Sequence, residues 1–447
     1  MKLREAIVSA AAMLLSYGSA LLLEHLAGLN LDVVVLAVVL AISLGRRNRV
    51  GAGPRSRLLA LVVLAAVSVA AGEVGRLMVD HPNVGDALFT LVPALAIWVR
   101  RFGVRSAAAG TLVTMPFIAV LVTPLPLPPG PGAPWWGAAV AVIVFCWVTL
   151  VAEVADRTGF TSRVVAEPPA AGDAGAAGAA RPRASTRMAL QMGVAMGVAF
   201  AVGRTFYPDH WTWVVLTAFI VGSGNRGRGD VIYKGLLRVA GAAASTAAAT
   251  ALTAAFGPGD RASVALILAI LAVATWLRTF NYAYWAAGVT AALALLYGYF
   301  GQGGPGLIRD RLGGILVGAA IAIAASWLVL PVSSSQVLRR RAADVLAVLK
   351  ELLAAPPGEV ASLQVRFRHA LARVEQVARP LELHRRLLRR GSGAAHPADA
   401  VTVIRGCTEA VDRLGTDHAA RAELALARAE LARVLRATRP PSPAARI

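Results

Sequence analysis

Long apolar stretches alternate with short polar, proline-containing or glycine-containing breaks along the chain as far as residue 330. A helix that crosses the ~30 Å hydrocarbon layer of a bilayer takes about 20 apolar residues, and most stretches approach that length. The pattern therefore predicts an all-α polytopic membrane protein with about twelve transmembrane helices. They are expected near residues 6–26, 28–45, 58–73, 87–99, 106–123, 135–155, 187–206, 211–224, 237–256, 262–278, 282–300 and 312–330.

After residue 331 the pattern changes to leucine, valine and alanine at helical spacing, with arginine and glutamate between them. Segments 333–355, 360–390 and 398–437 are expected to be helical, and residues 440–447 disordered. This C-terminal region is interpreted as cytosolic. A small helical bundle and an oligomerisation element are both compatible with it.

Residues 157–186 contain proline, alanine, glycine, aspartate and arginine without hydrophobic periodicity, which is typical of a flexible linker. The linker divides the apolar part into two halves of six spans. The predicted organisation is a first membrane repeat (1–156), a cytoplasmic linker (157–186), a second membrane repeat (187–331) and a cytosolic helical tail (332–447).

The two halves show signs of an internal duplication. Trp98, Arg100, Phe102 and Gly110 recur 178 positions later as Trp276, Arg278, Phe280 and Gly288, and Ser43 and Arg46 recur 180 positions later as Ser223 and Arg226. Because each half has an even number of spans, both copies would point the same way, related by an axis along the membrane normal. A tandem six-plus-six parallel repeat with a pathway between the halves is the resulting hypothesis.

Composition and charge support the membrane interpretation and add an orientation. Of the 447 residues, 57% are hydrophobic and only 16% charged, with a mean hydropathy of +0.62, which excludes an ordinary soluble protein. The 45 Lys+Arg against 25 Asp+Glu would suggest nucleic acid in a soluble chain. Here the excess falls mostly in loops on one side, so no nucleic-acid binding is expected, and both termini are placed in the cytoplasm. The cytoplasmic charges are Arg46, Arg47, Arg49, Arg55, Arg57, Arg100, Arg101, Arg105, Arg226, Arg228, Lys234, Arg238 and Arg278; Arg309 and Arg311 are the exception to the rule.

The sequence contains no recognisable catalytic constellation. A GxxxxGK[ST] phosphate loop and an HExxH motif are both absent, and the seven histidines form no metal-ligand spacing. Ser223 within Gly222-Ser223-Gly224 has no histidine that the sequence places beside it. The chain is therefore predicted not to be an enzyme and to need no cofactor or metal.

A family resemblance rests on two segments, the HWTWVVLTAFIV run that begins at His210 and the KGLLRVAG run that begins at Lys234, separated by a glycine-rich turn. This pattern resembles the fusaric acid resistance superfamily, which includes aromatic acid exporters and is related to plant aluminium-activated malate transporters. The resemblance covers the second membrane half well and the first half more weakly. It implies export of organic anions, aromatic or small carboxylates, across the inner membrane.

The candidate pathway residues combine the resemblance with the repeat. Spans two and eight are short and end in matching polar residues, which is a sequence indication of a substrate site. Arginine suits a carboxylate, and tryptophan can stack on an aromatic ring, although positive-inside anchoring and an interfacial aromatic belt explain the same residues. The candidates are Ser43, Arg46, Arg100, Trp211, Trp213, Ser223, Arg226 and Arg278, with Glu24, His25 and Glu153 as candidates for proton coupling.

Three other functions remain open at this level, and the weakest is a membrane-embedded enzyme, since the sequence contains no recognisable catalytic constellation. The lack of a buried carboxylate relay favours a passive, channel-like anion conductor. A membrane scaffold for envelope assembly would place the chemistry in a partner. The expected partners are the lipid bilayer, a small organic anion and a second copy of the chain that associates through the tail.

Overall fold

The computed structural model describes residues 2–29, 32–45, 53–123, 135–161, 184–225, 227–253, 257–301, 305–388, 396–414 and 418–438. All regular structure in these ranges is helical. The chain forms two compact units: unit 1 contains Met1–Ser223 and Lys234–Leu330, and unit 2 contains Gly224–Tyr233 and Pro331–Ile447. The predicted linker lies outside the described residues except at its two ends, where α6 finishes at Arg157 and α7 begins at Ala184.

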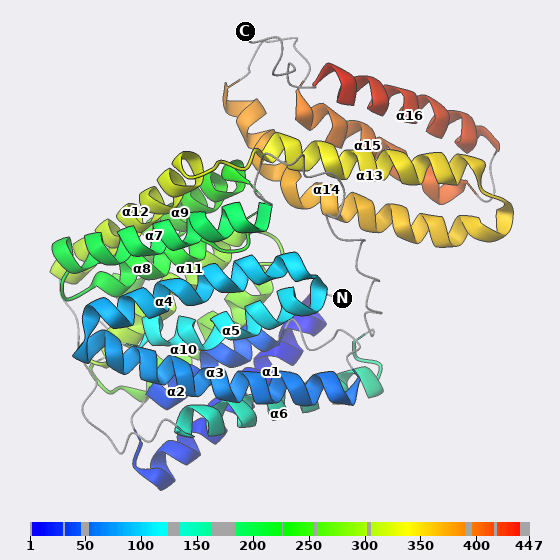
Figure 1. Ribbon diagram of the computed structural model, residues 1–447. Helices are drawn as coiled ribbons and strands as arrows, with labels where there is room; N and C mark the ends of the chain where they lie inside the picture. The colour runs from blue at the N-terminus through cyan, green and yellow to red at the C-terminus, as the bar shows by residue number, and fades with distance from the viewer. Residues whose placement is uncertain are drawn as a thin grey trace. The chain divides into compact units, whose positions relative to one another are not determined.

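Twelve α-helices coincide with the twelve predicted apolar stretches, with boundaries that differ by several residues (Figure 1). The largest shift is in α9, which begins at Arg228, nine residues before the predicted 237, and α3 extends beyond the predicted 58–73 at both ends. The helices are α1 (Lys2–Ala27), α2 (Asp32–Leu44), α3 (Pro54–Asp80), α4 (Pro82–Trp98), α5 (Val104–Val122), α6 (Trp135–Arg157), α7 (Ala184–Phe206), α8 (Trp211–Gly222), α9 (Arg228–Thr253), α10 (Arg261–Leu277), α11 (Tyr282–Tyr299) and α12 (Pro305–Leu328).

Six of these helices, α1, α3, α4, α6, α7 and α12, are long and apolar enough to cross a membrane. Shorter apolar segments occur in α2, α5, α8 and α10. At 13 and 12 residues, α2 and α8 reach only about 20 Å, less than the hydrocarbon thickness. The structure therefore confirms that α2 and α8 are short. That all twelve helices cross the membrane remains a prediction.

Two pairs of helices, each with one helix from either half, join the two halves of unit 1. α4 of the first half packs on α7 of the second, and α10 of the second packs on α1 of the first (Figure 1). Since α4 corresponds to α10 and α1 to α7 in the proposed repeat, these two interfaces are the pair that a two-fold relation would produce. Within the halves, α1 packs on α2 and α6 just as α7 packs on α8 and α12.

An ion pair joins the halves at the α4–α7 interface. Arg204 on α7 donates to both carboxylate oxygens of Asp86 on α4, at 2.7 and 3.0 Å, and to the backbone oxygen of Met78 at 2.9 Å. The two side chains are 28% and 14% exposed. Partial burial makes this pair a stronger contact than a surface salt bridge.

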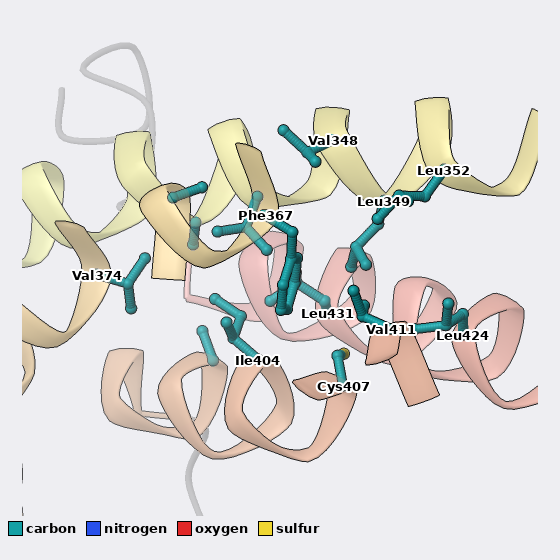
Figure 2. Close-up of a cluster of buried hydrophobic side chains, with 14 of the residues drawn as sticks. Val348, Leu349, Leu352, Phe367, Val374, Ile404, Cys407, Val411, Leu424 and Leu431 are labelled. Atoms are coloured by element: carbon teal, nitrogen blue, oxygen red, sulfur yellow. The ribbon is translucent and has the colours of Figure 1, made fainter. Parts of the chain in front are cut away.

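Unit 2 is built around four helices, α13 (Ser334–Ala354), α14 (Val360–Leu388), α15 (Pro397–Arg413) and α16 (His418–Ala437), with the short η2 (Pro357–Glu359) before α14. Their apolar faces share one core, in which Phe367 and Ile404 lie near the middle and Cys407 beside them (Figure 2). The bundle interpretation of the tail therefore matches the structure. The single helical segment predicted over 398–437 is wrong, because α15 ends before Leu414 and a separate helix begins at His418.

Unit 2 also includes the turn before α9. The backbone N–H of Arg228 donates to the oxygen of Val332 at 3.0 Å, and that of Gly229 donates to Ser334 Oγ at 3.0 Å. Gly227, at φ +150°, leaves no room for a side chain, because a Cβ there would lie 2.6 Å from Ser334 Oγ. The glycines of this turn thus allow close contact with the first residues of the tail.

Candidate functional site

Glycines on α12 allow α8 to lie directly against it. A Cβ added at Gly318 would lie 2.4 Å from the backbone oxygen of Val214 and 2.9 Å from Thr217 Cβ. At Gly313 it would lie 2.8 Å from the Tyr207 hydroxyl. Such small-residue contacts are typical of helix packing within membranes. They bring the first two turns of α8 against the middle of α12.

A second close contact joins α9 to α11. A Cβ added at Gly241 would lie 2.9 Å from the oxygen of Ala283 and 3.2 Å from Ala286 Cβ. Helices α9, α11 and α12 thereby place three further side chains, Arg238, Thr290 and Arg311, in the interior of the second half.

Arg238 on α9 and Arg311 on α12 are 3% and 6% exposed, and they are the buried arginines among the side chains that the structure describes. Both reach the backbone of α11 at successive turns. Arg311 donates through Nη2 to the oxygen of Thr290, and Arg238 donates through Nη1 to the oxygen of Ala286 at 3.5 Å. Thr290 lies near the middle of α11, so Arg311 reaches about 12 Å from either end of that helix.

Aromatic rings lie beside Arg311, and two buried hydroxyl groups lie on the helices that pack around it. The guanidinium carbon of Arg311 lies 5.9 Å from the centre of the Trp213 ring, and the Trp213 ring makes an edge contact with Tyr297 at 5.2 Å. Thr217 Oγ1 and Thr290 Oγ1 are buried, and within the described part of the chain neither has a hydrogen-bond partner. We call Arg238, Arg311, Thr217, Thr290, Trp213 and Tyr297 the arginine cluster.

The arginine cluster carries uncompensated positive charge. Neither arginine forms an ion pair with a carboxylate of the described residues, and the two guanidinium groups donate to oxygens of α11 that lie one helical turn apart. At the α12 start, His210 Nδ1 lies 3.8 Å from Asp310, outside the cluster itself. Two buried cations without a counter-charge are costly in an apolar interior, and an anion that entered there would reduce that cost.

The two candidate tryptophans lie at the start of α8, but their faces already contact protein groups. Trp211 has the Arg204 guanidinium 4.1 Å from its ring centre and Phe200 at 5.6 Å. Trp213 stacks on His210 at 4.6 Å with an interplanar angle of 21°. Of the two, Trp213 also contacts the arginine cluster.

The two serine candidates lie at the other ends of the short helices. Ser43 is half-buried near the end of α2, and Ser223 follows α8 and donates to the oxygen of Ile220 at 3.1 Å. Arg46 and Arg226 lie outside the described residues. Because α8 is about 18 Å long, Ser223 is a full helix length away from Trp211 and Trp213.

Arg100 and Arg278 follow α4 and α10 and are half-buried. The Arg278 guanidinium carbon lies 5.1 Å from the Trp285 ring centre. Near them the repeated aromatic pairs have matching geometry: Trp98 and Phe102 meet edge to face at 5.6 Å, and Trp276 and Phe280 at 5.8 Å. The equivalent glycines also match, since Gly110 faces Ala96 and Gly288 faces Ala274.

The proton-coupling candidates occupy accessible positions. Glu24 is half-buried and His25 exposed near the end of α1. Glu153 on α6 pairs with Arg157 at 3.1 Å and with Arg57 at 3.5 Å, beside an open pocket of about 720 Å³ lined mainly by apolar atoms. The structure therefore does not bring these three groups together, and none lies in the arginine cluster.

Sequence reasoning missed the arginine cluster. Arg238 was assigned to a cytoplasmic loop, and that assignment is wrong, because Arg238 lies ten residues into α9 and is buried. Arg311 carried a signal, since it violated the positive-inside pattern. Burial explains the violation, because a charge in the protein interior does not report loop orientation.

The apolar helices, six of which are long enough to cross a bilayer, indicate a multi-pass helical membrane protein. Within it, residues 194–325 match the family described as fusaric acid resistance protein-like, which confirms the predicted resemblance over most of the second half. Comparisons with curated proteins and with solved structures gave no match. The family suggests a role in membrane transport or efflux. No group of three or more potential metal ligands occurs among the described residues.

Proposed function

We propose that the protein exports organic anions, aromatic or small carboxylates, through a pathway between its two six-helix halves. The family match of residues 194–325 carries this proposal. The uncompensated positive charge of the arginine cluster, in the same half, supports an anionic substrate.

The cytoplasmic mouth of the pathway is assigned to the polar ends of α2 and α8. Ser43 and Ser223 lie there, Arg46 and Arg226 follow them within three residues of the sequence, and Arg100 and Arg278 contribute further positive charge that attracts the anion. The contacts of α4 with α7 and of α10 with α1 involve equivalent helices of the two halves, and they support a two-fold repeat around such a pathway. In this arrangement both termini are cytoplasmic and the protein resides in the plasma membrane.

A passive anion conductor is the second candidate. Among the described side chains, the buried carboxylate is Asp230, which belongs to unit 2, and the proposed coupling groups Glu24, His25 and Glu153 are accessible or ion-paired. A chain without a buried carboxylate in its membrane helices has little means to couple anion flux to protons. This observation favours conduction driven by the membrane potential alone.

Flux measurements in proteoliposomes test the function. Radiolabelled hydroxybenzoate and malate are followed with and without a pH gradient and at two membrane potentials. Flux that requires the pH gradient supports a coupled exporter, and flux that follows the potential alone supports the conductor. Folded protein without flux of either anion contradicts both.

A pair of arginine variants tests the assigned mouth. Arg278→Ala is expected to lower anion flux about tenfold by removing a charge that the repeat duplicates at Arg100. Arg101→Ala is the control, because its guanidinium covers Trp98 at 3.9 Å and the equivalent position is Thr279. Equal flux in both variants would contradict the assignment and favour simple anchoring.

A further inference from the structure

The arginine cluster lies inside the second half, and the described residues of the first half contain no equivalent. Arg238 and Arg311 come from α9 and α12, and the corresponding helices α3 and α6 bear no buried arginine. The arginines of those two helices, Arg55, Arg57, Arg76 and Arg157, are all at least partly exposed. The two halves therefore differ in buried positive charge, which is the feature that attracts an anion.

The hydrogen-bonding capacity of the two guanidinium groups is largely unused. Each guanidinium group has five N–H donors, and among the described residues each group makes a single hydrogen bond, to a backbone oxygen of α11. Arg238 Nε is buried and without a partner in the described part of the chain. A buried donor without a partner costs about 1–3 kcal/mol, and more when it is charged.

A carboxylate matches this environment in charge and in hydrogen bonding. It accepts from two guanidinium groups in the planar geometry that arginine favours. Two buried hydroxyls that lack partners among the described residues add donors to the same region: that of Thr290, whose backbone oxygen accepts from Arg311, and that of Thr217 on α8, which packs against α12. Trp213 and Tyr297 form an apolar, aromatic wall beside Arg311.

We infer that Arg238 and Arg311 form a single binding site for the carboxylate of an organic acid within the second half, between α8, α9, α11 and α12. This inference deepens the proposed function and rests on it for the choice of an organic anion. The site is distinct from the cytoplasmic mouth, because Ser223 and Trp213 lie at opposite ends of α8. One anion would then bind per chain, in contrast to the paired sites that an exact repeat would give.

Binding of benzoate to the full-length protein in nanodiscs tests the site, with benzamide as the uncharged ligand of similar shape. Benzoate is expected to bind and benzamide not. Arg238→Gln and Arg311→Gln should each raise the Kd for benzoate about tenfold or more, because each removes a charged hydrogen-bond donor. Arg309→Gln is the matched control on the same helix, since Arg309 is exposed, and it should change the Kd less than about twofold.

Thr217→Val and Thr290→Val remove a hydroxyl but keep the side-chain volume. They test the carboxylate site if the arginine variants fail to fold. Each should raise the Kd for benzoate about fivefold or more. Wild-type affinity in folded arginine or threonine variants would overturn the inference and make both arginines structural donors to α11. No binding of benzoate by the wild-type protein would overturn it as well.

The flux assay separates this inference from the proposed function. Wild-type hydroxybenzoate flux in folded Arg238→Gln and Arg311→Gln would leave transport standing and remove the site from it. Benzoate binding that depends on the arginines, in a protein without flux, would support the site and contradict the transport function.

Discussion

At the scale of single residues, charge in an apolar interior is the most informative feature of this protein. Lysine and arginine are rarely buried without a counter-charge, because desolvation costs several kcal/mol per ion. Arg238 and Arg311 are buried without one among the described residues, whereas Arg204 is paired with Asp86. The paired arginine has a structural explanation, and the burial of the two unpaired arginines is the basis of the inferred carboxylate site.

Cys407 in the core of unit 2 provides a prediction about reactivity. Burial, with a smaller contribution from Glu430, raises the pKa of the Cys407 thiol to about 11. At pH 8 its thiolate fraction should be about a hundredfold lower than in the unfolded chain, and alkylation of the native protein correspondingly slow. Cys146→Ser supplies the background for this measurement, because Cys146 is exposed.

The same pKa shift predicts how the stability of unit 2 depends on pH. Since the folded-state pKa lies above the ordinary value of 9.0, the unfolded thiol ionises first as pH rises. The free energy of unfolding should therefore fall between about pH 9 and 11 and be unaffected by this thiol below that range. Cys407→Ala should remove that part of the slope in denaturant titrations, and an unchanged slope would contradict the assignment.

At the scale of elements, glycine decides which helices come close. α8 is short and buried on nearly all of its residues, so it has to fit among neighbours on every side. Gly314 and Gly318 on α12 accept it, because Cβ atoms there would contact Trp213, Val214 and Thr217. The α8–α12 interface thus positions two members of the arginine cluster, Trp213 and Thr217.

Gly318→Ala tests this interface. Its methyl group would lie 2.4 Å from the oxygen of Val214, so we expect the variant to lose about 1–3 kcal/mol of stability by overpacking. Gly197→Ala on α7 is the control, because no atom lies within 4 Å of its added Cβ and alanine is the better helix former. Melting temperatures in detergent should fall for Gly318→Ala and stay level or rise for Gly197→Ala; similar changes in both would contradict the argument.

At the scale of the whole molecule, the two halves of unit 1 are related in packing but not in chemistry. The α4–α7 interface contains the Asp86–Arg204 pair, while its counterpart, α1 against α10, has Leu26 and Val264 at the positions 178 residues away. The arginine cluster is likewise confined to the second half. The two halves therefore share their pattern of helix packing but differ in where their polar and charged contacts lie.

Exchange of charge tests the contact between the halves. Asp86→Asn and Arg204→Gln should each destabilise the protein by about 1–3 kcal/mol, because each leaves a partly buried charge unpaired. The exchanged pair Asp86→Arg with Arg204→Asp should recover part of that loss relative to either single reversal. Arg76→Gln, which removes the exposed pair with Glu73, should change stability by less than about 0.5 kcal/mol. Additive effects of the two reversals in thermal unfolding would rule out a coupling across the interface.

The sequence by itself determined the helical class, the intervals of the twelve apolar helices, the shortness of α2 and α8, and the family resemblance. These follow from hydrophobic patterning and local motifs, which act over one helix at a time. The tail was predicted to be helical, but the break between α15 and α16 was not, because the helical spacing continues across it.

Tertiary structure alone decided which charges are buried. Arg228 and Arg238 look alike in sequence, ten residues apart in an arginine-rich stretch, yet one begins α9 and the other reaches the middle of the second half. That difference depends on Gly241, which brings α9 close to α11, and on the carbonyl groups of α11 that Arg238 and Arg311 meet. Contacts between helices far apart in the chain set the electrostatic environment of each arginine, and no pattern within a single helix contains that information.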